Sequence, residues 1–172
     1  MSDIRGRDPS GQLRDVGVSQ HGNLIVAGRV FATPYIEIQG ITASAAYATG
    51  DAFGGKFNFH VPKSGVIETV TMLDMDDEGI ETELWLFHYD FTATTDNSAF
   101  AVSDDDLKKL EAVVGITNFA NVGNNQVGIN NGLGLAYVAP EGKFYCQCVT
   151  RGAPNIAAAN IPLVALRIVS YE

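Results

Sequence analysis

The segment KFNFHVPKSGVIETVTML, residues 56–73, sets the fold class of this chain. Apolar and polar side chains alternate strictly from Lys56 to Val61, which is the period of a half-buried β-strand. Pro62 to Gly65 is a cluster of turn residues, and the β-branched run from Val66 to Leu73 is typical of a second strand. The segment therefore predicts two strands joined by a short turn.

The same pattern continues along the rest of the chain. Short apolar runs separated by Gly, Pro and Asn predict further strands, and residues 81–89 have the composition of a central strand that is apolar on both faces toward its end. Strands do not alternate with long helices, so we do not expect a parallel α/β enzyme fold. We predict an all-β fold, a jelly-roll-like β-sandwich over residues 23–172. The residues expected in its core include Val70, Trp85, Leu86, Phe87 and Leu166.

A single short α-helix is expected within this fold. Ser103 is a suitable N-cap, and the three aspartates at 104–106 favour the positive end of a helix dipole. Gly115 would end the helix. Its apolar face would be formed by Leu107, Leu110, Val113 and Val114. The Asn/Gly-rich residues 118–134 that follow are interpreted as a surface loop.

Residues 1–22 differ from the rest of the chain. They contain several glycines and a proline, and their scattered apolar residues have the period of neither a helix nor a long strand. We therefore predict an extended N-terminal arm, which could reach roughly 75 Å at about 3.3 Å per residue and which we expect to contact a neighbouring chain. The arm lacks the hydrophobic region of a secretory signal, so we expect assembly in a host cytoplasm.

The charge balance limits the partners. The 172 residues include 11 Lys and Arg against 20 Asp and Glu, a formal net charge of −9. Nucleic acid and anionic membranes are bound by clustered basic residues, so we expect neither as a partner. Cys146 and Cys148 would lie on one face of a strand, which suits a disulfide between them poorly. We predict two reduced, buried and inert thiols.

The acidic residues 74–79 are the best metal-site candidate in the sequence. Asp74, Asp76, Glu78 and Gly79 match the start of a calcium-binding loop. Trp85 stands where such a loop requires a bidentate Glu, and strands are expected on both sides instead of helices. We interpret the segment as a solvated acidic turn, with a weak calcium site of another type as the alternative.

The remaining chemistry-bearing residues form no recognisable motif. His21, His60 and His88 have none of the spacings of zinc sites. The sequence contains no G-x-S-x-G nucleophile motif and no glycine-rich phosphate loop. We therefore assign no catalytic, cofactor-binding or metal-binding residue and expect a protein that is not an enzyme and uses no cofactor.

Aromatic side chains leave one binding function open. A flat platform for a sugar ring could come from Tyr35, Tyr47, Phe53, Phe57, Phe59 and Trp85, although such residues usually belong to the core. Tyr47 and Phe53, in the Ala/Gly-rich segment 43–55, are the two that we expect to be exposed. A carbohydrate-binding module is therefore an alternative function.

Three segments carry a resemblance to a known group of proteins. Residues 83–107, ELWLFHYDFTATTDNSAFAVSDDDL, are similar to a run of the form "LFLFD…T.TDNAAF…ADLAKL…VV". Residues 144–154, FYCQCVTRGAP, are similar to a later strand of the form "L.G.LVTRG.P". With the opening DVGVSQHGNLIV at 15–26, these segments resemble structural proteins of tailed-bacteriophage virions. The likeness covers most of residues 15–170 and brings no catalytic residues.

The resemblance implies a virion component, and we expect a capsid decoration (cement) protein that coats and strengthens the outer capsid. Its partners would then be the major capsid protein and copies of itself. The low charge density and the Ala/Gly-rich strands leave broad uncharged surfaces, which favour a homo-oligomer, and we expect a homotrimer. The alternatives are another virion role, in a tail, baseplate or head fibre, and the carbohydrate-binding module.

Overall fold

The computed structural model describes residues 5–7, 13–15 and 28–170. Within the predicted arm, β1 (Arg5–Arg7) pairs antiparallel with β2 (Leu13–Asp15), so that Arg5 lies opposite Asp15. This part of the arm is thus a short hairpin instead of one extended segment. The other residues of the predicted arm, and residues 23–27 of the predicted domain, lie outside the described residues.

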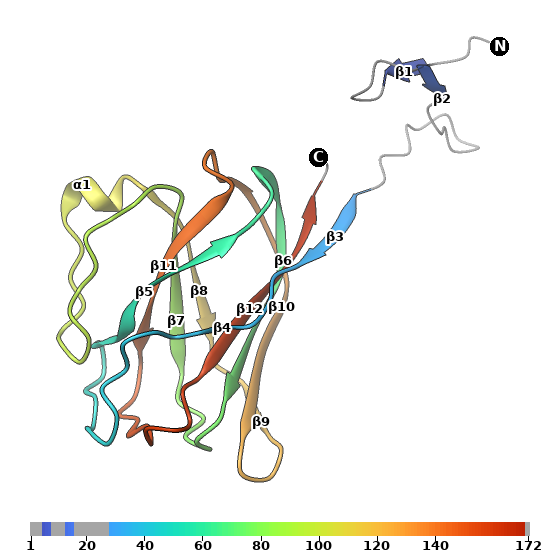
Figure 1. Cartoon of the computed structure of the whole chain (residues 1–172). Helices are drawn as coiled ribbons and strands as arrows, with labels where there is room; N and C mark the ends of the chain where they lie inside the picture. The colour runs from blue at the N-terminus through green and yellow to red at the C-terminus, as the bar shows by residue number, and fades with distance from the viewer. Residues whose placement is uncertain (1–4, 8–12, 16–27, 171–172) are drawn as a thin grey trace.

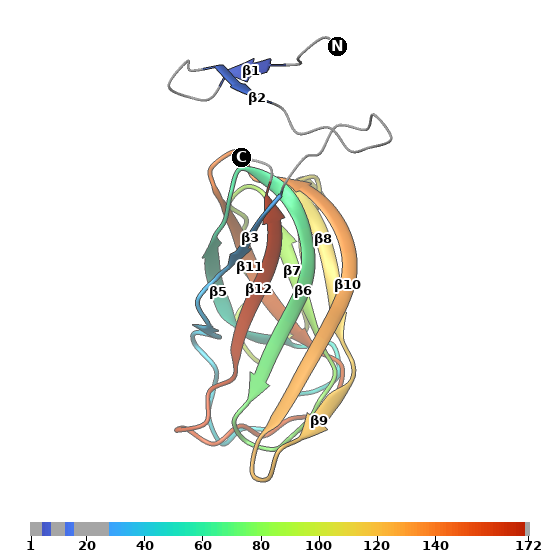
Figure 2. The same ribbon diagram turned by 90° about the vertical axis from the view of Figure 1, so that its right-hand side faces the viewer.

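The body consists of two antiparallel sheets that face each other (Figures 1 and 2). The larger sheet has the strand order β3-β12-β6-β10-β9, with β4 also paired with β12, and the smaller has the order β5-β11-β7-β8. The strands of the larger sheet are β3 (Arg29–Ala32), β4 (Ile36–Glu37), β6 (Ser64–Asp74), β9 (Phe119–Asn121), β10 (Gln126–Val138) and β12 (Leu163–Ser170). Those of the smaller sheet are β5 (Ala52–His60), β7 (Thr82–Phe87), β8 (Leu110–Ile116) and β11 (Lys143–Thr150). The predicted all-β sandwich is confirmed.

The chain passes repeatedly from one sheet to the other. β5 and β6 are the two strands predicted from residues 56–73, and they belong to opposite sheets. The short turn between them is therefore a corner of the sandwich. As a result, Phe57 and Phe59 of β5 enter the core from one side, and Ile67 and Val70 of β6 enter it from the other.

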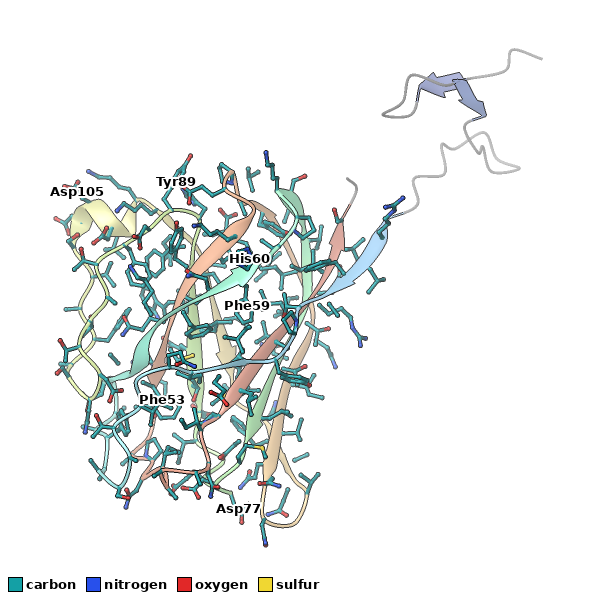
Figure 3. The ribbon with its side chains drawn as sticks, viewed as in Figure 1. Phe53, Phe59, His60, Asp77, Tyr89 and Asp105 are labelled. Carbon is teal, nitrogen blue, oxygen red and sulfur yellow. The ribbon has the colours of Figure 1, made fainter. Side chains whose placement is uncertain are left out.

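Large side chains from both sheets fill the space between them. Phe59 and Phe144 of the smaller sheet and Ile67, Leu166 and Ile168 of the larger are almost completely buried. Figure 3 marks Phe59 on β5. Burial of each such side chain contributes about 1.5–3 kcal/mol to stability. The core is therefore large enough to hold the sandwich together without a disulfide or a metal.

Four of the five predicted core residues are buried. Val70, Leu86, Phe87 and Leu166 have almost no exposed surface, as expected. The prediction was wrong for Trp85, which is only partly buried. Trp85 points out of the sandwich, and its indole Nε1 donates a hydrogen bond to the Glu83 side chain on the same face of β7.

The predicted helix begins at the expected residue but is shorter than predicted. Ser103 caps α1 (Asp104–Leu107), and its Oγ accepts a hydrogen bond of 3.1 Å from the Asp106 amide. Residues 110–114, which were expected to continue the helix, belong instead to β8 (Leu110–Ile116). Pairing with β7 buries Val114 and Ile116 in the core, and β-branched side chains favour a strand over a helix. The tertiary contact therefore outweighs the helical spacing.

The predicted surface loop at 118–134 was also wrong. These residues form β9 and much of β10, which pair with each other and lie in the larger sheet. Gly128 is required there, because a Cβ at this position would lie 2.6 Å from Ile116 Cγ2 in the core. Gly132 and Gly134 have φ values of 67° and 59° and lie within a break in the β10–β6 register. Glycines that indicated a loop instead permit close packing and a bulge.

Candidate functional site

Residues 88–109, which connect β7 to β8 and include α1, are called the strap here. The strap lies along the outer face of the smaller sheet, at the left of Figure 1. Phe91 of the strap stacks on Phe87 with the ring centroids 4.0 Å apart, and Phe100 packs against Trp85 at 4.8 Å. The strap therefore covers apolar side chains that would otherwise face water.

Polar contacts also bind the strap to the smaller sheet. Gln147 of β11 is completely buried on this outer face. Its Oε1 accepts a hydrogen bond of 3.0 Å from the Thr94 amide, while its Nε2 donates to the carbonyl oxygens of Thr94 (2.7 Å) and Gly54 (2.9 Å). Every hydrogen-bonding atom of the amide thus has a strap or β5 backbone partner, as a buried polar group requires.

Asp96 of the strap organises the loop that precedes β5. Its carboxylate accepts hydrogen bonds from the amides of Gly54 (2.6 Å) and Thr42 (2.8 Å) and from the Tyr47 hydroxyl (2.9 Å). Burial raises the pKa of the Tyr47 hydroxyl, and its hydrogen bond to Asp96 raises it further.

Tyr47 and Phe53 are only 3% and 2% exposed, so the expectation that they are exposed aromatics was wrong. They pack edge to face in the core and offer no platform to a sugar.

The outer face of the larger sheet contrasts with this covered face. Figure 2 looks onto it, and none of the described segments crosses β12, β6 or β10 on this side. Three rows of side chains run across it. They are Ala165, Thr71 and Ile129; Ala32, Arg167, Thr69 and Asn131; and Val30, Val169, Val66 and Ala136. We call this surface the open face. A solvated antiparallel face usually carries polar side chains, so its aliphatic composition sets it apart.

Several large apolar side chains of the open face are well exposed to solvent. The exposed fractions are 70% for Val30, 49% for Ile129 and 60% for Val138, and that of Tyr35 at its margin is 47%. In the sequence, Tyr35 was one of the aromatic candidates for a sugar platform, but it was not among the two expected to be exposed. Ile129 was not identified as a surface residue. The sequence signal for an apolar outer face was the run LVALRIV at 163–169. Its odd-numbered and even-numbered positions are both mostly apolar, which predicts a strand that is apolar on both faces.

A shallow cavity of about 330 Å³ lies at the centre of the open face. Its polar lining consists of Thr33, Thr69, Thr71, Asn131, Tyr35 and Arg167, and aliphatic side chains complete it. Arg167 is the only charged residue in the lining. A cavity of this size is at the lower limit for small-ligand sites, and it holds no pair of groups suited to acid–base catalysis.

Arg167 also differs from most basic residues of the described chain. Five others form ion pairs, which are Lys56–Asp90, Lys108–Asp105, Lys109–Asp106, Lys143–Glu141 and Arg151–Glu83. Arg167 has no such partner among the described residues, although acidic residues outnumber basic ones in the chain. An unpaired guanidinium in a nearly uncharged surface is available to an external carboxylate.

The acidic turn at 74–79 is held by hydrogen bonds within the protein. Asp74 is buried and accepts from the amides of Asp76 (2.9 Å) and Gly79 (2.6 Å). Asp76 accepts from the Ala157 amide and from the Asn160 side chain, both at 2.6 Å. These donors occupy the carboxylate oxygens that a calcium ion would need, and the described residues contain no group of three or more His, Cys, Asp or Glu placed to hold a metal. The interpretation as an acidic turn agrees with this geometry, but the turn is only partly solvated, because Asp74 is buried.

The histidines and cysteines are not brought together into a site. His60 ends β5, and His88 lies just beyond β7 with Nδ1 3.2 Å from Glu111 Oε2. His21 lies outside the described residues. Cys146 and Cys148 are free, completely buried thiols in the core, and burial raises the pKa of both. The predicted burial of the thiols is therefore confirmed, and a raised pKa makes them poor nucleophiles.

Acid should loosen the strap. Hydrogen bonds from Lys56 and Lys109 hold the pKa of Asp90 and Asp106, respectively, below the usual carboxyl range. A depressed pKa in the folded state contributes stability that is present above the unfolded pKa of about 3.9 and is lost as the pH falls from there through the lower folded pKa. We expect the melting temperature to fall as the pH is lowered below about 4. Asp106→Asn should make this fall smaller, whereas Asp105→Asn, at an exposed pair, should leave it unchanged. Equal acid sensitivity in both variants would contradict the assignment to Asp106.

No protein-family model and no curated protein matches this chain. Among the helices of the described chain, none is long and apolar enough to cross a membrane. The open face, with Arg167 at its centre, is the candidate functional site because it exposes large apolar side chains around one unpaired charge.

Proposed function

We propose that this protein is a non-enzymatic structural component of a tailed-phage virion that decorates the outer capsid and stabilises it. The resemblance of residues 83–107 to virion proteins supports the class. This segment corresponds to most of β7 and nearly all of the strap, α1 included, so the similar residues form one structural unit. The partners proposed are the major capsid protein and copies of this chain, as a homotrimer.

The strand order gives separate support at the level of architecture. The order β3-β12-β6-β10 in one sheet and β5-β11-β7-β8 in the other, with β4 and β9 as additions, supports the proposal of a jelly roll. Viral capsid proteins and lectins both use jelly rolls. One architecture serves many functions, so surface chemistry has to distinguish between them.

The open face is the observation that carries the proposal. An exposed aliphatic sheet face with one central charge suits contact with another protein surface, and it provides no reactive groups. A decoration protein needs such contacts because it acts by bridging neighbouring subunits, and many copies make modest individual contacts sufficient. The net charge of −9 suits the outside of a DNA-filled head, since a protein on the inner surface would face phosphates.

The proposal is tested on purified virions and on heads that lack the protein. We expect antibodies against this chain to label heads, and heads without it to rupture at lower temperature. Deletion of residues 1–22 should leave the described body folded and weaken attachment to such heads. Attachment as tight as that of the full chain would show that the arm is not the clamp. Labelling confined to tails would overturn the decoration role in favour of a tail or baseplate component.

The carbohydrate-binding alternative now depends on the central cavity. Tyr35 provides an exposed ring, and Thr69, Thr71 and Asn131 provide polar groups around it. Sugar sites combine such groups. Binding of the isolated protein to a panel of glycans, lost in Tyr35→Ala, would favour this alternative over the virion role.

A further inference from the structure

We propose that copies of this chain associate with one another through the open face, with Arg167 of one copy meeting a carboxylate of its neighbour. The inference builds on the assembly role proposed above and names the surface that self-association would use. It rests on the difference between the two outer faces of the sandwich, on the distribution of charge and on the area available.

Both sheets are apolar on their outer faces, and both faces therefore require a cover. The smaller sheet presents Trp85, Phe87 and Tyr145 outward, and the strap packs over them. The larger sheet presents aliphatic side chains such as Val30 and Ile129 outward, and no described segment covers them. Leaving such a face in water forfeits the free energy that burial of its apolar surface would provide. A second protein surface would recover this free energy.

Charge favours a second copy of the chain as that surface. Contact between two copies of a protein of net charge −9 brings together like charges unless the contact surface has few carboxylates. The rows of the open face contain none, and their single charged residue is Arg167. Glu37 lies at the edge of the same sheet opposite Leu163, and Glu68 lies at a register irregularity of β6 beside Arg167. Neither carboxylate forms an ion pair within the described chain. Arg167 within the rows and these two carboxylates beside them are thus charges of opposite sign without an ion pair in the described chain, and they can pair between copies.

The area suits a modest contact. Four strands at about 4.8 Å spacing and seven residues at about 3.3 Å each give roughly 400 Å² in projection per copy. Tyr35 and Val138 at the margins enlarge it. Two such faces together cover about 800 Å² in projection, which is below the roughly 1,200 Å² in total that stable specific interfaces bury, so the contact belongs to the weak class. We expect micromolar association in solution, strengthened where many copies are held on one surface.

The test is the mass of the full-length protein by sedimentation or light scattering up to about 100 µM, well above a micromolar dissociation constant. The wild-type chain should form a trimer or dimer. Ile129→Asp should raise the dissociation constant by about 30-fold or more. Val122→Asp is the matched control, because Val122 is 58% exposed and lies beyond the end of β9, outside the open face. It adds the same charge and should leave association unchanged.

Arg167→Glu, at an exposed position, should also weaken association. It should not affect folding, which circular dichroism and thermal melting would check.

Three results would overturn the inference. The first is a monomer at every concentration. The second is equal weakening by Ile129→Asp and Val122→Asp, which would show that charge alone acts and that the surface lies elsewhere. The third is a chain that is monomeric at full length and associates once residues 1–22 are removed, which would mean that its own arm occupies the face. Association through the open face by a protein absent from virions would instead refute only the proposed function.

Discussion

Phe87→Ala should lower the free energy of unfolding by about 3–5 kcal/mol, the usual cost of removing a fully buried phenylalanine. Phe87 is completely buried beneath the strap, where it stacks on Phe91 at 4.0 Å and belongs to a cluster with Tyr145. Its loss would leave a cavity between the smaller sheet and the strap. The effect therefore measures how much of the stability lies outside the central core.

Urea denaturation followed by circular dichroism provides the measurement, and Trp85→Ala provides the control. Trp85 lies two residues earlier on the same strand and also faces the strap, but it is only partly buried. Removing it should cost about half as much, roughly 1–2 kcal/mol. If Phe87→Ala costs no more than Trp85→Ala, the strap does not pack on the smaller sheet as described.

The sequence predicted the sandwich because its strands alternate polarity clearly. In the segment at 56–61, Phe57 and Phe59 are buried while Asn58 and His60 are exposed, as strict alternation requires. The short turn after this segment was also predicted. Its role as a corner between sheets was not, because a strand pattern does not say which sheet the next strand joins.

Two local signals were misleading for related reasons. The spacing of Leu107, Leu110 and Val114 suits a helix, yet β7 offered Val114 a buried partner that a short helix could not match. The glycines of 118–134 indicated a loop, yet Gly128 is needed where β10 approaches Ile116. In both cases a contact distant in sequence decided the local structure, and no local pattern reports such a contact.

The open face could be predicted only in part. A strand that is apolar on both faces, such as 163–169, indicates a covered sheet, but the sequence does not show which segments supply the cover. The strap covers one sheet because Asp96, Gln147 and Phe91 fix it there. Only the assembled structure shows that the other sheet lacks an equivalent among the described residues. The resemblance to virion proteins includes much of the strap and therefore says little about the open face.

Gln147→Leu should lower the free energy of unfolding by about 3–5 kcal/mol, because one buried and two partly buried backbone groups lose their partner at about 1–3 kcal/mol each. The groups are the Thr94 amide, the Thr94 carbonyl and the Gly54 carbonyl. Leucine has nearly the same size as glutamine, so the cavity term is small and the hydrogen bonds are tested directly. Gln126→Leu is the matched control, because the Gln126 amide donates to Asp77 in an exposed setting, where loss of a hydrogen bond costs about 1 kcal/mol or less.

The way in which Gln147→Leu destabilises the protein distinguishes two roles for the strap. If the strap is an integral layer, the variant should unfold in one transition, and amide exchange should rise across both sheets. If the strap can detach by itself, exchange should rise mainly at residues 88–102 while β12 and β6 remain protected. We expect the first result, because Asp96 and Phe91 also bind the strap to the body, at β5 and β7. Exchange confined to the strap would show that the outer face of the smaller sheet can also be opened to a partner. The open face would then no longer be the single uncovered surface of the sandwich within the described chain.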